Sequence, residues 1–212
     1  MTRILIADDH AVLCHGLKQI LAEDFPDAEF GEAATVQETL DRLGQERWDV
    51  LVLDIFMPEG GGMQVLAASV PKPPVLVLSS APEEQMALYV IRAGAAGYLN
   101  KRAAPKELVK AVRKVLSGGR YLSPDKVADL LTDSARPPLE LLTVREFQVL
   151  QMIALGKSPN DIAAELAISF KTVSSFHSSL LKKLGLRHDV ELAHYAMDHG
   201  LIERATIPRS DP

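Results

Sequence analysis

The sequence DVLVLD, residues 49–54, decides the fold, because four consecutive apolar residues stand between two aspartates. A strand that is apolar throughout is buried on both faces, as in a parallel sheet covered by helices. Similar short runs occur at 3–8, 28–33, 74–79 and 96–100. Amphipathic stretches typical of helices alternate with these runs, near 11–22, 35–46, 62–69, 83–93 and 105–117. This alternation predicts an α/β doubly wound, flavodoxin-like fold with five parallel strands.

The composition changes after this first half. The segment SPDKVADLL (123–131) predicts a short extra helix, and TDSARPP (132–138) is polar and stiff, as a linker is. Beyond it the patterns are helical only, and a capping box of Thr143 and Glu146 opens the first of four short helices. The tight turn between the second and third of these helices is typical of a helix-turn-helix unit. We therefore expect one domain at 1–120, a linker at 121–138 and an all-α domain at 139–212.

Charge and cysteine content narrow the class of protein. The 212 residues carry a net charge of -5, and residues 139–212 hold 8 Lys and Arg against 9 Asp and Glu. Any basic surface in the helical half must therefore be local. The single cysteine, Cys14, excludes an internal disulfide, and neither a signal peptide nor a run of membrane-spanning length is evident. These features predict a cytoplasmic protein that does not enter a membrane.

Polar residues follow several of the predicted strands. Asp8 and Asp9 end the first strand and Asp54 ends the third, and these ends are neighbours at the switch point of a flavodoxin-like sheet. Carboxylates that lie so close together cannot all stay ionised unless a cation joins them. Oxygen ligands of this kind suit Mg²⁺. Ser79 and Lys101 follow the fourth and fifth strands, and they add a hydroxyl and an ammonium. One such residue is usually only a cap or a solvated turn, but together they predict an aspartate that accepts a phosphoryl group.

These residues resemble the receiver domain of two-component response regulators over residues 1–120. The matching segments are ADDH, VLDIFMPEGGG, VLVLSSA and AGAAGYLNK. The resemblance implies phosphorylation of Asp54, and a Mg²⁺ ion held by Asp9, Asp54 and the backbone carbonyl of Phe56, with Asp8 acting mostly through water. It also implies that Ser79 and Tyr98 form a switch pair, in which Tyr98 rotates inward as Ser79 and Lys101 contact the phosphoryl group.

The helical half resembles the LuxR-type helix-turn-helix domain of the NarL/FixJ response regulators. The segment that carries this resemblance is LTVREFQVLQMIALGKSPNDIAAELAISFKTVSSFHSSLLKKLGL. It implies binding to double-stranded promoter DNA, usually as a homodimer, in response to a sensor histidine kinase. Contact with RNA polymerase is a further partnership compatible with this family.

Within that segment, TVSSFHSSLLKK (172–183) is the expected recognition helix. Helical spacing places Val173, His177, Leu180 and Leu184 on an inward face, with Phe176 and Leu181 at its borders. The residues expected to contact DNA are Lys171, Thr172, Ser174, Ser175, Ser178, Lys182 and Lys183. The family commonly has lysines where this chain has Ser174 and Ser178. We therefore expect a shallow salt dependence, with about 2–4 phosphates neutralised per protomer. A serine hydroxyl can either donate or accept, so the serines alone predict little choice between base edges and phosphates.

Two other functions remain open from the sequence. A phosphorylated signalling adaptor would act through protein contacts without DNA, and the serine-rich helix and the negative charge are its only support. A phosphotransferase or aspartate-based phosphatase needs a second acid two positions after Asp54, where Phe56 stands. We expect no enzyme activity beyond self-phosphorylation and self-dephosphorylation.

Overall fold

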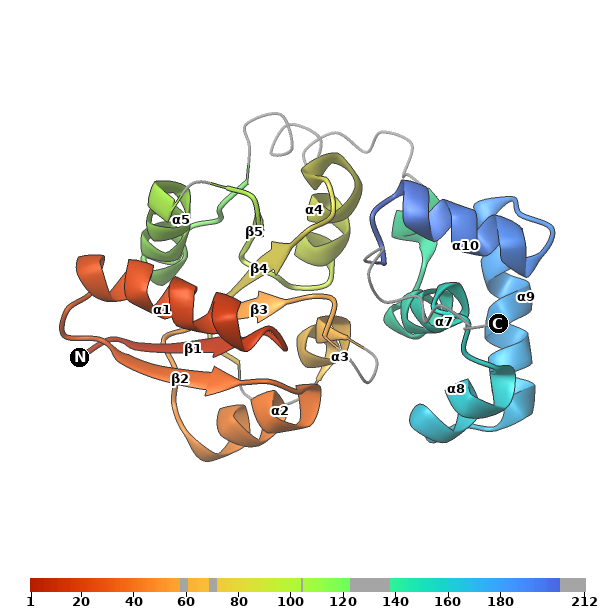
Figure 1. Cartoon of the computed structure of the whole chain (residues 1–212), viewed down its shortest axis with the longest axis horizontal. Helices are drawn as coiled ribbons and strands as arrows, with labels where there is room; N and C mark the ends of the chain where they lie inside the picture. Colours follow the sequence, from red (N-terminus) through yellow and green to blue (C-terminus); the bar gives the residue numbers. More distant parts are fainter. Residues whose placement is uncertain (58–60, 69–71, 104, 123–137, 203–212) are drawn as a thin grey trace. The chain divides into compact units, whose positions relative to one another are not determined.

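The computed structural model describes residues 1–57, 61–68, 72–103, 105–122 and 138–202 (Figure 1). The chain divides into two compact units, Met1–Ser134 and Ala135–Pro212. This division falls within the predicted linker at 121–138, whose own limits stay a prediction. The short helix predicted at 123–131 lies outside the described residues.

The first unit alternates strands and helices, as predicted. Its elements are β1 (Arg3–Ala7), α1 (Ala11–Asp24), β2 (Glu29–Ala33), α2 (Val36–Gln45), β3 (Val50–Asp54), α3 (Gly62–Ala67), β4 (Val75–Ser79), α4 (Glu83–Arg92), β5 (Gly97–Asn100) and α5 (Pro105–Leu116). All strand pairs are parallel, and the strands are ordered β2-β1-β3-β4-β5. The flavodoxin-like topology expected from the sequence is confirmed.

Helices cover both faces of this sheet (Figure 1). Every residue of β3 and β4 is buried, which explains why the sequence of each strand is apolar up to its last residue. On one face, Ile4, Ile6 and Val52 pack in a single core cluster with residues of α1 and α5. Because side chains alternate along a strand, the intervening Leu5 and Leu51 face the opposite layer.

Because the strands are all parallel, they all end at the same edge of the sheet. The polar residues that end or directly follow β1, β3, β4 and β5 are thereby brought to one place, although they are far apart in the sequence.

The second unit is helical. After a 3-10 turn at Pro138–Leu141 come α7 (Val144–Ala154), α8 (Pro159–Glu165), α9 (Phe170–Leu184) and α10 (Asp189–Asp198). The predicted capping box of Thr143 and Glu146 is present, and a second one joins Ser158 to Asp161. Phe147 of α7 is fully buried among these helices. The predicted helix-turn-helix pair is α8 and α9, which pack against each other.

The third helix of the unit, α9, contains the whole of the expected recognition helix at 172–183. Ser169 caps it by accepting a hydrogen bond from the Thr172 N–H, and Gly185 ends it in the left-handed conformation. Val173, Leu180 and Leu184 are buried, as predicted for the inward face. His177, predicted on the same face, is only partly buried, and its Nε2 contacts Asp189 of α10. In the turn before α9, Ala167 has a φ of 51°, a conformation that glycine adopts more easily.

Among the described residues, no helix is both long enough and apolar enough to cross a membrane.

Candidate functional site

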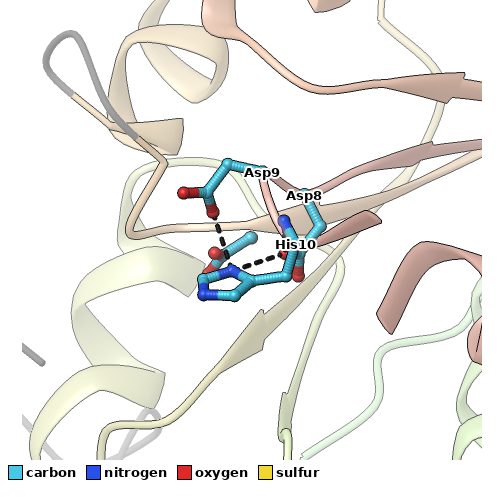
Figure 2. Close-up of side chains that lie close together, drawn as sticks. Asp8, Asp9 and His10 are labelled. Atoms are coloured by element: carbon cyan, nitrogen blue, oxygen red, sulfur yellow. Dashed lines mark hydrogen bonds and ion pairs between the residues drawn. The ribbon is translucent and has the colours of Figure 1, made fainter. Parts of the chain in front are cut away.

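The acidic residues meet at the carboxyl edge of the sheet. Asp8, Asp9, His10 and Asp54 each place one ligand atom within 4.8 Å of the others. Asp8 and Asp54 are buried, whereas Asp9 and His10 are exposed. Figure 2 shows Asp8, Asp9 and His10 converging from the segment that follows β1. The neighbouring positions of β1 and β3 in the sheet produce this cluster, as the sequence predicted.

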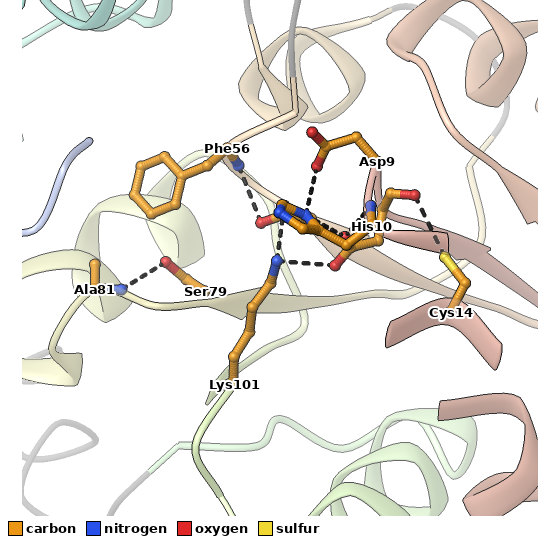
Figure 3. A network of polar contacts seen from close by, with 9 residues as sticks. Asp9, His10, Cys14, Phe56, Ser79, Ala81 and Lys101 are labelled. Carbon is orange, nitrogen blue, oxygen red and sulfur yellow. Dashed lines mark hydrogen bonds and ion pairs between the residues drawn. The ribbon is translucent and has the colours of Figure 1, made fainter. Parts of the chain in front are cut away.

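Lys101 lies between the two buried carboxylates (Figure 3). Its Nζ is 2.9 Å from Oδ2 of Asp8 and 2.9 Å from Oδ2 of Asp54. Its position is fixed from β4, because the backbone N–H of Lys101 donates to the carbonyl of Ser79 at 2.8 Å. Burial raises the pKa of Asp54 to about 6, and the Lys101 ammonium opposes that rise. Burial disfavours the charged form of Lys101 too, but the two carboxylates outweigh it and raise its pKa.

The cluster has the character of a site for a hard cation. Oδ2 of Asp8 is buried, and its partner is the Lys101 ammonium 2.9 Å away. The three carboxylates of Asp8, Asp9 and Asp54 form an acidic pocket that is compatible with a bound metal ion.

The loop after β3 fixes the position of Asp54. The backbone N–H of Phe56 donates to Asp54 Oδ1 at 3.1 Å, so the Phe56 backbone, the predicted fourth ligand group, lies next to the cluster. Gly62 packs so closely on this loop that a Cβ there would lie 2.2 Å from the Asp54 carbonyl oxygen. A residue with a side chain at position 62 would therefore displace the loop that holds Asp54.

The two predicted switch residues meet at Ala81. Ser79 Oγ accepts a hydrogen bond from the Ala81 N–H at 3.1 Å, and the Tyr98 hydroxyl donates to the Ala81 carbonyl. Asn100 donates to the same carbonyl at 2.8 Å. The Tyr98 side chain is buried, with 2% of its surface exposed. A shift of the backbone at Ala81 would therefore reach Ser79 and Tyr98 together.

His10 is a residue of this site to which the sequence assigned no role. Its Nδ1 lies 3.0 Å from Asp9 Oδ1 and 3.2 Å from Asp8 Oδ1, while its backbone N–H donates to Asp8. Partial burial disfavours the imidazolium, but the two aspartates outweigh it and raise the pKa of His10. The feature of the sequence that could have indicated this role is the position of His10 directly after Asp8 and Asp9. Cys14 is buried and donates through its thiol to the Asp8 carbonyl.

A second candidate surface is the outward side of α9. Lys171, Ser175, Ser178 and Lys182 are exposed, and Ser174 is partly exposed. Thr172 is partly buried, and its hydroxyl is 2.8 Å from the capping hydroxyl of Ser169. Most of the residues predicted to contact DNA therefore lie on one accessible side of this helix.

Lys183 is the exception in this set. Its Nζ is 2.7 Å from Oε2 of Glu146, a side chain that is only 5% exposed, and Ser179 donates to the other oxygen of that carboxylate. The contact ties α9 to the capping box of α7. Burial opposes ionisation of Glu146, but hydrogen bonds from Lys183, Ser179 and Thr143 outweigh it and lower its pKa to about 2. The sequence pointed to Glu146 as a cap only, and a DNA contact by Lys183 stays a prediction.

Comparisons with known proteins match both units. The family model described as the response regulator receiver domain matches residues 4–113, and that of the bacterial regulatory proteins of the luxR family matches residues 140–196. Response regulator UvrY of Escherichia coli (strain K12) is 34% identical, covering 98% of this chain and 99% of its own length. Transcriptional regulatory protein UhpA of Salmonella typhimurium is 38% identical, covering 93% and 99%.

A solved structure of similar architecture is RcsB from Salmonella enterica serovar Typhimurium, bound to promoter rprA in the presence of the phosphomimetic BeF3−. It is 27% identical, with a TM-score of 0.72, and the match covers 92% of this chain and 97% of that one. Another structure of RcsB shows two dimers bound to two parallel DNAs, with a TM-score of 0.55 and 27% identity.

Proposed function

This chain belongs to the two-component response regulators of the NarL/FixJ family, with a receiver domain and a LuxR-type DNA-binding domain, and we propose that phosphorylation of Asp54 controls its binding to promoter DNA. The chain is a DNA-binding regulator of transcription. The observation that carries the proposal is the position of Asp54, buried in an acidic cluster and 2.9 Å from Lys101.

Asp54 is the proposed phosphoryl acceptor. A carboxylate oxygen of Asp54 attacks the phosphorus of a phosphohistidine on the sensor histidine kinase. A new P–O bond forms as the P–N bond breaks, and the leaving imidazole nitrogen keeps the electron pair. Lys101 supports this role because its ammonium can neutralise charge on the transferred group. We propose no enzyme activity beyond self-phosphorylation from small phosphodonors and the later hydrolysis of the acyl phosphate.

The proposed cofactor is Mg²⁺. The carboxylates of Asp9 and Asp54 and the backbone carbonyl of Phe56 would hold it, with Asp8 acting mostly through water. The oxygen-rich donor set, with ligand atoms of Asp8, Asp9 and Asp54 within 4.8 Å of one another, supports this assignment. When bound, the ion would neutralise the oxygens of the incoming phosphoryl group.

The same residues supply the proposed switch. The phosphoryl group adds nearly two negative charges and three acceptor oxygens at Asp54. The Ser79 hydroxyl would donate to one of these oxygens and Lys101 would pair with another. Because Tyr98 and Ser79 both bond to Ala81, the motion of Ser79 would be coupled to Tyr98 and to the surface around β5.

The proposed partners follow from the family. The chain would bind double-stranded promoter DNA through α9, as a homodimer when phosphorylated, and would contact RNA polymerase at the promoter. The DNA-bound RcsB structures support DNA as the partner. The proposed location is the cytoplasm. No further observation favours the adaptor that acts without DNA.

The test of the acceptor is site-specific phosphorylation by a small phosphodonor, followed by intact-protein mass spectrometry with and without Mg²⁺. We expect one added phosphoryl group on wild type, none on Asp54→Asn, and none in EDTA. Asp41→Asn is the matched control, since Asp41 is an exposed aspartate on α2. Equal labelling of Asp54→Asn and wild type would contradict the proposal.

A further inference from the structure

Three serines of α9 donate their hydroxyl protons to carbonyls of the same helix. Ser174 Oγ donates to the carbonyl of Phe170 at 3.1 Å, Ser175 Oγ to that of Lys171 at 3.0 Å, and Ser178 Oγ to that of Ser174 at 3.0 Å. A hydroxyl has one proton to donate and two lone pairs that accept. Since each proton is used within the helix, only the lone pairs are directed outward.

These serines form one small patch, the serine patch of Ser174, Ser175 and Ser178. Residues three and four apart are neighbours on a helix surface, so Ser178 adjoins both of the others. Four residues of helix rise by about 6 Å, which spans roughly two base-pair steps of about 3.4 Å. The patch matches two to three adjacent base pairs in size.

We infer that the serine patch reads DNA as a set of hydrogen-bond acceptors, and so recognises the exocyclic amino groups of adenine and cytosine in the major groove. The inference rests on the proposed binding of DNA by α9. Adenine N6 and cytosine N4 are the donors on that groove surface, whereas guanine N7 and O6 and thymine O4 are acceptors. Two acceptors that face each other share no proton, so guanine and thymine are disfavoured opposite the patch.

From the sequence alone, these serines are expected to contact bases and phosphates with little selectivity, whereas hydroxyls that donate within the helix favour the amino groups of bases. Phosphate oxygens are acceptors too, so a serine would have to give up its bond within the helix in order to donate to one. Phosphate contacts are left to side chains such as Lys171 and Lys182 at the two ends of the helix, both exposed. Every base pair carries one amino group in the major groove, on its adenine or its cytosine. The patch therefore selects the strand on which that amino group lies.

Base analogues test this inference on the full chain, activated with beryllofluoride. Selection from a random duplex library first gives a bound sequence, and each dA or dC in it is then replaced by the analogue that lacks the exocyclic amino group. We expect a two- to tenfold loss of affinity at one to three adjacent positions, about the effect of one neutral hydrogen bond. Replacing dG by 7-deaza-dG at positions opposite the patch should change nothing.

Serine variants identify the partner of each amino group. Ser174→Ala, Ser175→Ala and Ser178→Ala keep the helix, and each should abolish the analogue effect at its own position. Ser117→Ala is the matched control, because Ser117 donates to the Lys114 carbonyl in the receiver unit, and it should leave every effect intact. Circular dichroism checks that each variant is folded.

Each result bears on the inference. The inference is overturned if the amino-group analogues do not change the affinity while 7-deaza-dG weakens binding and the serine variants remove that weakening. DNA binding by the chain would still stand in that case. An analogue effect that persists in all three alanine variants would overturn it as well. If selection enriches no duplex, DNA binding by this chain fails, and the inference fails with it.

Discussion

Glu146 connects the capping box of α7 to α9, and its replacement by glutamine should loosen that connection. Its carboxylate accepts from the Thr143 N–H at 2.7 Å and pairs with Lys183 at 2.7 Å, while Ser179 donates to its other oxygen. The fall in its pKa from 4.5 to about 2 corresponds to about 3 kcal/mol of stability. We expect Glu146→Gln to lose about 2–3 kcal/mol of unfolding free energy at neutral pH.

The same contact gives a pH dependence whose sign is fixed. The pKa of Glu146 is lower in the folded than in the unfolded chain, so its contribution is complete above about pH 4.5 and is lost as the pH falls toward 2. Glu146→Gln should remove this part of the acid sensitivity of the helical unit. Urea titrations read by hydrogen exchange of peptides from α9 measure both effects in the full chain.

Neighbouring lysines supply the control for this prediction. Lys183→Met removes the partner of Glu146, whereas Lys182→Met makes the same chemical change at an exposed position. We expect Lys183→Met to destabilise α9 by more than about 1 kcal/mol and Lys182→Met by less than about 0.5 kcal/mol. Equal effects of the two variants, or a Glu146→Gln chain as stable as wild type, would refute the reasoning.

Four further outcomes follow from other features of the structure. Ala167→Gly should stabilise the helical unit by about 0.5–1 kcal/mol in urea unfolding, because glycine adopts the positive φ at this turn without strain. Phe147→Ala should destabilise that unit by about 3–5 kcal/mol by leaving a cavity, with no change in hydrogen exchange of the receiver. Lys101→Met should raise the pKa of Asp54 further above its usual range, as followed by carboxyl carbon NMR, because the ammonium is the main group that opposes the effect of burial. In a plot of the logarithm of DNA affinity against the logarithm of salt concentration, the slope should correspond to about 2–4 phosphates neutralised per protomer. A much steeper slope would contradict the expectation that α9 brings few cations to the DNA.

Much of the fold follows from local sequence. VLVL between two aspartates predicts a strand buried on both faces, and Val50–Asp54 is one. The capping box at Thr143 and the glycine at position 185 set helix ends, because each satisfies backbone groups that the helix leaves free. The acidic cluster could be predicted as well, since parallel topology brings the ends of β1 and β3 together.

Contacts between distant side chains could not be predicted in this way. The sequence places Lys183 at the basic end of α9, where a phosphate contact stays a prediction, but it does not reveal the contact with Glu146, 37 residues earlier. The role of His10 depends on the direction of its ring, and the role of the serine patch depends on side-chain rotamers. Sequence spacing specifies the face of an element on which a residue lies, but not which bond its side chain makes there.

The central claim is that phosphorylation of Asp54 controls DNA binding, and DNA affinity with and without beryllofluoride tests it most directly. The measurement compares wild type with Asp54→Asn on one selected duplex, with Asp41→Asn as control. We predict that beryllofluoride tightens binding of wild type and Asp41→Asn and leaves Asp54→Asn unchanged. An equal gain for Asp54→Asn, or no gain for wild type, would contradict the account.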